Sequence, residues 1–204
     1  MILKRITDAT SEPVSLVEIK NHLRLSTSTG IEDDLLNSFI KTAREQAENK
    51  TKRAFLTQTW RFVMDDFPGD ETAITLPRPP LSTAAGSVTV TYTKDDTAYS
   101  STTVASSAIA IDRDSEPCRI FPSGLNEWPD DVSTALNSVT IDYICGASAA
   151  SFVPESIKSW IKLRVGTMYE NRESLVMSQF LNQQEQGRSF VDGLLDPYTI
   201  TEVY

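Results

Sequence analysis

The sequence has few of the residues on which most enzymes and metal proteins depend. It contains two cysteines, one histidine and eight glycines among 204 residues. Two cysteines and one histidine cannot complete a four-ligand zinc shell without carboxylates, and no Walker or dinucleotide-binding glycine pattern is present. We therefore expect no cofactor and no resident metal ion. Cys118 and Cys145 are expected to be free, partly buried thiols.

Long hydrophobic runs are also missing. No stretch approaches the roughly 20 apolar residues that span a bilayer, and the first five residues, MILKR, do not open a signal peptide. These absences predict a soluble protein that is made in a cytoplasm and has no membrane partner.

Basic residues are scarce in the middle of the chain. Residues 57–152 contain five basic and thirteen acidic residues, a charge of −8 out of a total of −9. Gripping nucleic acid requires lysine and arginine gathered on one face. The charge therefore predicts a protein that stands near DNA without binding it.

What is present is helical periodicity at both ends of the chain. Residues 15–18 (SLVE) have the form of a capping box and predict a short helix to about Leu25. A longer helix is expected from near Ile31, with ion pairs Lys41–Glu45 and Glu48–Lys52 on its solvent side. A third runs from Pro154 to about Glu173. The expected buried positions are Leu35, Leu36, Phe39, Ile40, Ala43, Ala47, Ile157, Trp160, Ile161, Val165 and Met168.

Between these helices the period falls to two, which is typical of half-buried antiparallel strands. Strands are expected near residues 60–64, 88–92, 109–111, 119–121 and 138–144. They are short and polar, so we expect them to lean on the helices through Trp60, Trp128 and Tyr143. The predicted fold class is α+β, a helical bundle built from the N- and C-terminal helices with an inserted antiparallel β lobe. The expected divisions are 1–56 for the N-terminal helices, 57–152 for the acidic lobe and 153–204 for the C-terminal helix, tether and tail.

Two patterns invite a chemical interpretation. Gly146 to Ala150 follows a strand and precedes a helix, as a nucleophile elbow does, so a small hydrolase that uses Ser148 is an alternative function. The motif lacks its last glycine, and the one histidine, His22, lies upstream on a polar helix face. The carboxylates of 112–116 (DRDSE) resemble a calcium loop, but Pro117 and Ser123 occupy its required glycine and glutamate positions. We expect no catalytic and no metal-binding residue.

The C-terminal end combines a polar tether with an apolar tail. Residues 178–189 are rich in glutamine and have no period, whereas the segment that follows is too apolar for a free end. It can dock on its own bundle or on a partner. The candidate partner-binding residues are Phe190, Leu194, Leu195, Tyr198, Ile200 and Tyr204.

Seven short segments, in this order and spacing, resemble one protein family. They are residues 13–16 (PVSL), 33–36 (DDLL), 57–60 (TQTW), 76–81 (LPRPPL), 153–155 (VPE), 169–173 (YENRE) and 194–198 (LLDPY). The chain resembles the head–tail connector (adaptor, head-completion) proteins of tailed bacteriophages and prophages. The Ser-, Thr- and Ala-rich run from 100 to 110 departs from the usual pattern.

The resemblance implies a structural virion protein and not an enzyme. Such a connector assembles as a ring under the portal and extends the DNA channel toward the tail. The implied partners are the portal protein, a head-completion (stopper) or tail protein, and other copies of the chain, while DNA passes without specific binding. The implied location is the virion neck, after synthesis in the bacterial host cytoplasm. Another phage tail or neck protein-binding module is the alternative. The ring's copy number, the state of the isolated protein and the lobe that lines the channel stay open.

Overall fold

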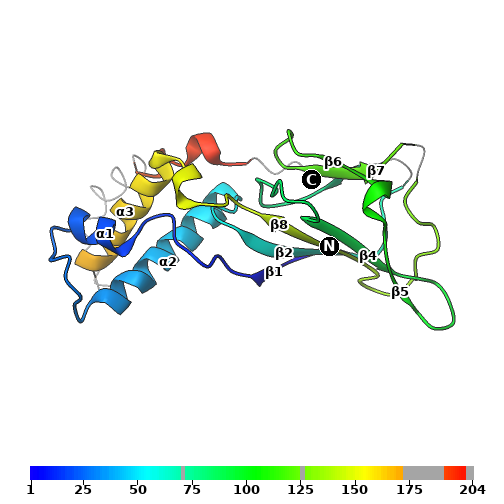
Figure 1. Cartoon of the computed structure of the whole chain (residues 1–204), viewed down its shortest axis with the longest axis horizontal. Coiled ribbons are helices and arrows are strands. Elements are labelled where there is room, and N and C mark those ends of the chain that lie inside the picture. The colour runs from blue at the N-terminus through cyan, green and yellow to red at the C-terminus, as the bar shows by residue number, and fades with distance from the viewer. Residues whose placement is uncertain (70–71, 125–126, 172–190, 201–204) are drawn as a thin grey trace, which may run out of the picture. The chain divides into compact units, whose positions relative to one another are not determined.

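The chain folds into two compact units. The computed structural model describes residues 1–69, 72–124, 127–171 and 191–200 (Figure 1). The strand unit consists of residues 1–9 and 57–148, and the helical unit consists of residues 10–56 and 149–204. The predicted α+β class is confirmed. None of the helices in the described ranges is long and apolar enough to cross a membrane.

Three helices form the frame of the helical unit: α1 (Leu16–His22), α2 (Asp33–Thr51) and α3 (Glu155–Glu170). The predicted capping box is present, because Ser15 Oγ accepts from the Glu18 amide at 3.3 Å while Glu18 Oε2 accepts from the Ser15 amide at 2.8 Å. Short 3-10 turns lie at Ala150–Phe152 (η2) and Asp196–Tyr198 (η4).

Apolar side chains at helical spacing fill the space between these helices. The predicted stripes of α2 and α3 are buried, except that Leu35, Phe39 and Met168 at their flanks are only half-buried. The buried set is Ile19, Leu36, Ile40, Ala43, Ala47, Ile157, Trp160, Ile161 and Val165.

The expectation that Glu48 lies on the solvent side of α2 was wrong. Glu48 was expected to pair with Lys52 in solvent, but it is buried beside Arg44, which is fully buried. Arg44 Nη1 donates to Glu48 Oε2 at 2.9 Å and Arg44 Nε donates to Glu12 Oε2 at 2.8 Å. Glu48 Oε1 also accepts from the Phe55 amide at 2.9 Å. The residues that follow α2 fold back over its polar end. The i,i+4 spacing of charged residues along the helix does not predict this fold-back.

The strand unit contains two antiparallel sheets. The five-stranded sheet has the order β1-β2-β8-β4-β5 and the three-stranded sheet has the order β3-β7-β6. A 3-10 turn, η1 (Ser106–Ala108), precedes β6. The strands are β1 (Ile2–Thr7), β2 (Gln58–Met64), β3 (Ile74–Thr75), β4 (Val88–Thr93), β5 (Ser101–Thr103), β6 (Ile109–Asp112), β7 (Arg119–Pro122) and β8 (Val139–Cys145).

Strands β1, β3 and β5 were not predicted. Residues 1–9 were grouped with the helices, yet β1 pairs with β2, whose Phe62 faces Leu3 across the ladder. A strand of this kind gains its stability from a partner more than fifty residues away, so its own sequence carries little signal. The division at 1–56, 57–152 and 153–204 stays a prediction.

The strand unit has its own buried core of strand residues, including Val90, Ile120 and Ile141. The three aromatic residues expected to contact the helices have partners within this unit. Trp128 stacks on Phe67 with ring centroids 4.9 Å apart. The Tyr143 hydroxyl donates to the Pro77 carbonyl at 2.8 Å, and the Arg78 guanidinium lies 5.1 Å from the centre of the Trp60 ring.

Candidate assembly surfaces

The apolar C-terminal segment is fastened to its own helical unit. Leu195 is buried, whereas Leu194, Tyr198 and Ile200 are half-buried. Phe190 and Tyr204, the other two candidates, lie outside the described residues.

Main-chain and charged contacts hold this segment to α2 and α3. The Ile200 amide donates to the Thr51 carbonyl at 3.0 Å, and Arg53 Nε donates to the Tyr198 carbonyl at 2.6 Å. Asp192 accepts from Lys50 at 2.6 Å and from the Trp160 ring N–H at 3.0 Å. Partial burial raises the pKa of Asp192, but these two donors outweigh burial and the pKa lies below its usual value. The half-buried side chains therefore project from an anchored backbone.

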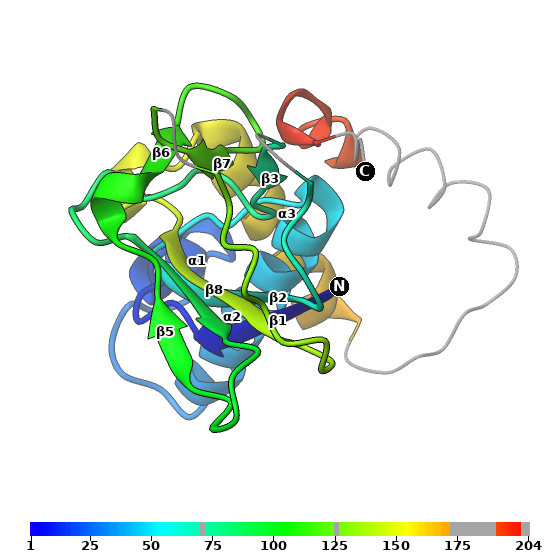
Figure 2. The same ribbon diagram turned by 90° about the vertical axis from the view of Figure 1, so that its right-hand side faces the viewer.

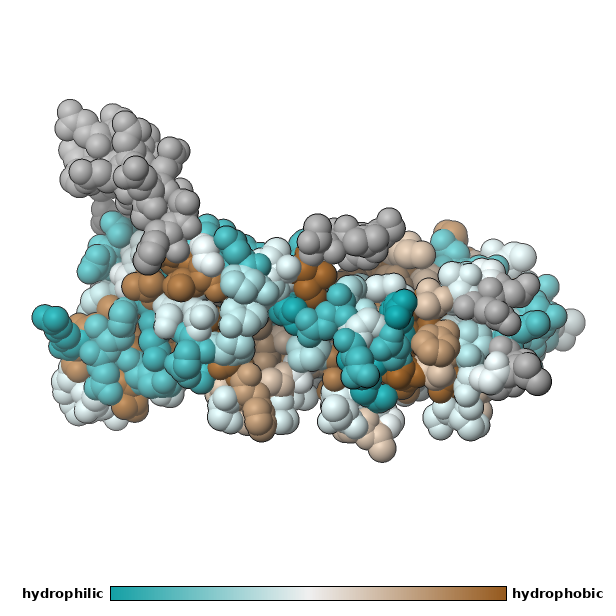
Figure 3. All heavy atoms as spheres, turned by 90° about the horizontal axis from the view of Figure 1, so that it is seen from above, coloured by the Kyte–Doolittle hydropathy of each residue, from teal (hydrophilic) through white to brown (hydrophobic). Residues whose placement is uncertain are grey.

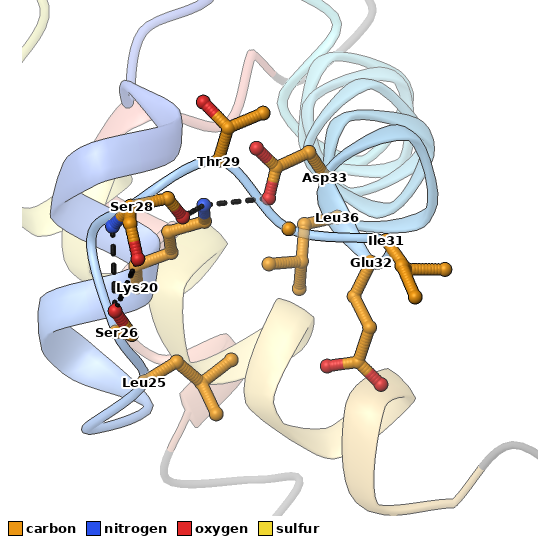
Figure 4. A pocket seen from close by; sticks show the side chains of 10 residues that line it. Lys20, Leu25, Ser26, Ser28, Thr29, Ile31, Glu32, Asp33 and Leu36 are labelled. Atoms are coloured by element: carbon orange, nitrogen blue, oxygen red, sulfur yellow. Dashed lines mark hydrogen bonds and ion pairs between the residues drawn. The ribbon is translucent and has the colours of Figure 1, made fainter.

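A pocket of about 370 Å³, lined by both polar and apolar side chains, lies between α1, the loop of residues 25–32 and the start of α2 (Figure 4). Lys20 is almost fully buried and its ammonium reaches two oxygens, Asp33 Oδ1 at 2.5 Å and the Ser28 carbonyl at 2.8 Å. The hydrogen bond from Lys20 lowers the pKa of Asp33. The lysine is thus satisfied within its own chain, and its role is to hold the loop against α2.

One end of the five-stranded sheet is strongly acidic. The register places the end of β2 and the end of β4 on either side of the start of β8. The loops at this end carry paired carboxylates, and Lys94 pairs with one of them, Asp131, at 3.0 Å. The hydrogen bond from Lys94 lowers the pKa of Asp131, so that carboxylate stays ionised. We call this the acidic end, and it consists of Asp65, Asp66, Asp95, Asp96, Asp130 and Asp131.

The segment that resembles a calcium loop is held by local hydrogen bonds to Asp112. Asp112 is occupied by hydrogen bonds from Ser115 and Arg119, which hold its pKa well below the usual range. Across the described ranges, no group of three or more His, Cys, Asp or Glu residues could hold a metal ion. Ser148 and His22 are each exposed.

Both cysteines are buried thiols outside any disulfide. Burial raises the pKa of the Cys118 thiol, which makes it a poor nucleophile at neutral pH.

These features define an α+β protein with a helical unit and a strand unit. The sequence matches the model of the phage gp6-like head-tail connector protein family over residues 13–114, half of the chain. The chain belongs to this family, as the resemblance of its seven segments predicted. It is a structural connector of the virion, and its place is the neck, where head and tail meet.

Solved structures of similar fold come from gene transfer agent (GTA) particles. A chain from the neck of an empty GTA particle, computed with C6 symmetry, is 22% identical with a TM-score of 0.76. A chain from the neck of the native particle, computed with C12 symmetry, is 21% identical with a TM-score of 0.73. A chain from the native virion is 21% identical with a TM-score of 0.69. Each match covers 100% of this chain and 98% of the other. A search of curated protein sequences gives no significant match.

Proposed function

We propose that this connector closes into a ring beneath the portal and extends the DNA channel toward the tail. The family match over residues 13–114 carries this proposal. The sixfold and twelvefold symmetry computed for the similar neck chains supports a ring. In such a ring each copy offers two different faces to its neighbours, a heterologous interface that closes by rotation.

The ring has a portal protein on one side and a head-completion (stopper) or tail protein on the other. We assign the portal contact to residues 191–200, with Leu194, Tyr198 and Ile200 as the contacting side chains. Support comes from their partial exposure on a backbone that is already anchored to α2. An anchored segment loses little conformational freedom on binding, which favours affinity. Phe190 and Tyr204 are also proposed as portal-contacting side chains, on the basis of the sequence alone.

The portal contact is tested by Tyr198→Ala and Ile200→Ala in the full-length chain. Each should weaken association with the portal protein about tenfold or more, because central aromatic and apolar anchors dominate interfaces. The unfolding midpoint should stay close to wild type, because the main-chain bonds to Thr51 and Arg53 are retained. Binding is measured by co-purification and by titration with the portal protein of the same genome neighbourhood.

Thr199→Ala is the matched control, since Thr199 lies between the two anchors and is exposed. It should bind the portal as wild type does. Undiminished association of both anchor variants would remove this segment as the docking element.

DNA passes this connector without being held. The acidic end supports this, because like charges across an aqueous channel repel. We also infer that the chain performs no chemistry. The strand unit, which ends at Ser148, contains no histidine, so a Ser148→Ala variant should assemble as the wild-type chain does.

A further inference from the structure

The five-stranded sheet has two edges, formed by β1 and β5 (Figure 2). β1 pairs with β2 on one side, and β5 pairs with β4 on one side. Among the described residues, no strand covers the other side of either. An edge strand presents unpaired N–H and C=O groups, which form a template for another chain.

The β1 edge carries exposed apolar side chains. Ile2 is 53% exposed and Ile6 is 45% exposed, and Met1 precedes them. The pairing with β2 is irregular between Arg5 and Thr7, which limits the regular edge to residues 2–5. This length suits a short partner strand.

The β5 edge is preceded by an exposed aromatic residue in an unusual conformation. Tyr99 has φ +48° and is 64% exposed. A bulky residue rarely adopts a left-handed backbone, and such conformations gather at functional positions. Here the Asp96 carboxylate enforces it by accepting from the amides of Ala98 and Ser100, both at 3.0 Å, and from the Ser100 hydroxyl at 2.5 Å. The turn is built to present Tyr99 to solvent beside β5.

Charge favours a contact between the two edges in different copies. Residues 1–9 have a net charge of +1, because Arg5 pairs with Asp8 at 3.1 Å and Lys4 adds a positive charge, whereas residues 57–148 carry a net charge of −8. When the β1 edge of one copy meets residues 57–148 of the next copy, a positively charged segment therefore meets a negatively charged one. On the face that Figure 3 presents, hydrophobic side chains form small separate patches rather than one broad apolar surface. Main-chain pairing at an edge does not need a broad patch.

We propose that the β1 edge of one copy pairs with the β5 edge of the next, with Tyr99 packing against the apolar side chains of β1. This inference rests on the proposed ring. The two edges differ, so the contact is heterologous and repeats by rotation until the ring closes. The strand unit then supplies a continuous sheet from copy to copy.

Cross-linking tests the pairing directly. The full-length double variant Ile2→Cys/Thr102→Cys should form a ladder of disulfide-linked multimers on mild oxidation, because each copy donates one thiol to each neighbour. The native cysteines are buried and stay in place. The matched control is Ile2→Cys/Thr89→Cys, in which the second thiol replaces an exposed threonine on the interior strand β4. It should give no ladder, and each single variant should stop at dimers.

Native mass spectrometry and electron microscopy of the same samples distinguish a failure of the strand pairing from a failure of the proposed ring. Rings with a ladder support the pairing. Rings without a ladder overturn the pairing and leave the proposed ring intact. The absence of rings at every protein concentration, alone and with the portal, overturns the ring and the pairing together.

Tyr99→Gly is the second test. Glycine adopts φ +48° freely, so the unfolding midpoint of the monomer should stay the same or rise. The concentration for half-assembly should nevertheless increase about tenfold or more. Asn137→Gly is matched to it, because Asn137 also has a positive φ, of +63°, and is exposed. That control should assemble as wild type, and unchanged assembly of Tyr99→Gly would overturn the anchor role.

Discussion

At the scale of single residues, the buried guanidinium of Arg44 is the clearest stabilising feature of the helical unit. It joins Glu48 on its own helix to Glu12 in the segment before α1. Glu48 in turn accepts the amide of Phe55, just after α2. A buried charge is favourable only when its partners compensate for lost hydration, and here hydrogen bonds from three chain segments do so. The network ties the segments on both sides of α2 to the helix.

Arg44→Met should therefore destabilise the protein by about 3–5 kcal/mol, because it leaves two carboxylates without their buried partner. Urea unfolding of the full-length chain measures this free energy. Lys41→Met on the exposed side of the same helix is the control, and it should change the free energy by less than about 0.5 kcal/mol. Equal small effects of both variants would mean that Arg44 is not a structural centre.

At the scale of elements, α1 is only seven residues long and depends on its cap. The Ser15 amide and hydroxyl both donate to the Glu18 carboxylate, and these bonds lower the pKa of Glu18 below its usual 4.5. Lys162 of α3 lies 3.5 Å from the same carboxylate. The cap thus also links α1 to α3.

Ser15→Ala should lower stability by about 0.5–2 kcal/mol at neutral pH. Because folding lowers the pKa of Glu18, the stabilisation is fully present above pH 4.5 and is lost as the pH falls through the lower, folded pKa. The difference between wild type and variant should therefore shrink in acid. Thermal unfolding of both proteins across this range measures it, and a pH-independent difference would contradict the carboxylate's part in the cap.

At the scale of the whole molecule, acidity is concentrated in one of the two units. Residues 57–148 carry a charge of −8 and their acidic end gathers six carboxylates. In the proposed ring every copy repeats this acidic end, and the summed negative charge repels the DNA phosphates. Weak contact with the duplex is what the proposed function requires of this end of the sheet.

The assembled connector should therefore fail to retain duplex DNA at moderate salt. Asp95→Lys/Asp130→Lys changes two exposed carboxylates of the acidic end and should increase retention in a salt-sensitive way. Fluorescence anisotropy with a labelled duplex across a salt series makes the comparison. Tight binding by the wild-type chain with a steep salt slope would rule out passive passage.

The sequence by itself determined the elements with a strong local signal. The helices that begin after Ser15 and Pro154, the apolar stripe through Leu36 and Ile40, and the alternation in β2, β4 and β8 depend on neighbouring residues, and the structure has all of them. The family was likewise readable from the order and spacing of seven short segments, and the family model that matches residues 13–114 agrees with it.

Only the tertiary structure decided which distant segments meet. β1 is a strand because β2 lies beside it, and Glu48 is buried because Arg44 and the chain after α2 enclose it. Tyr99 takes its strained conformation from Asp96, three residues earlier, and its place at a free edge from the pairing of β4 with β5. Local propensity contributes little at such positions, because their free energy comes from contacts that form only when the whole chain has folded.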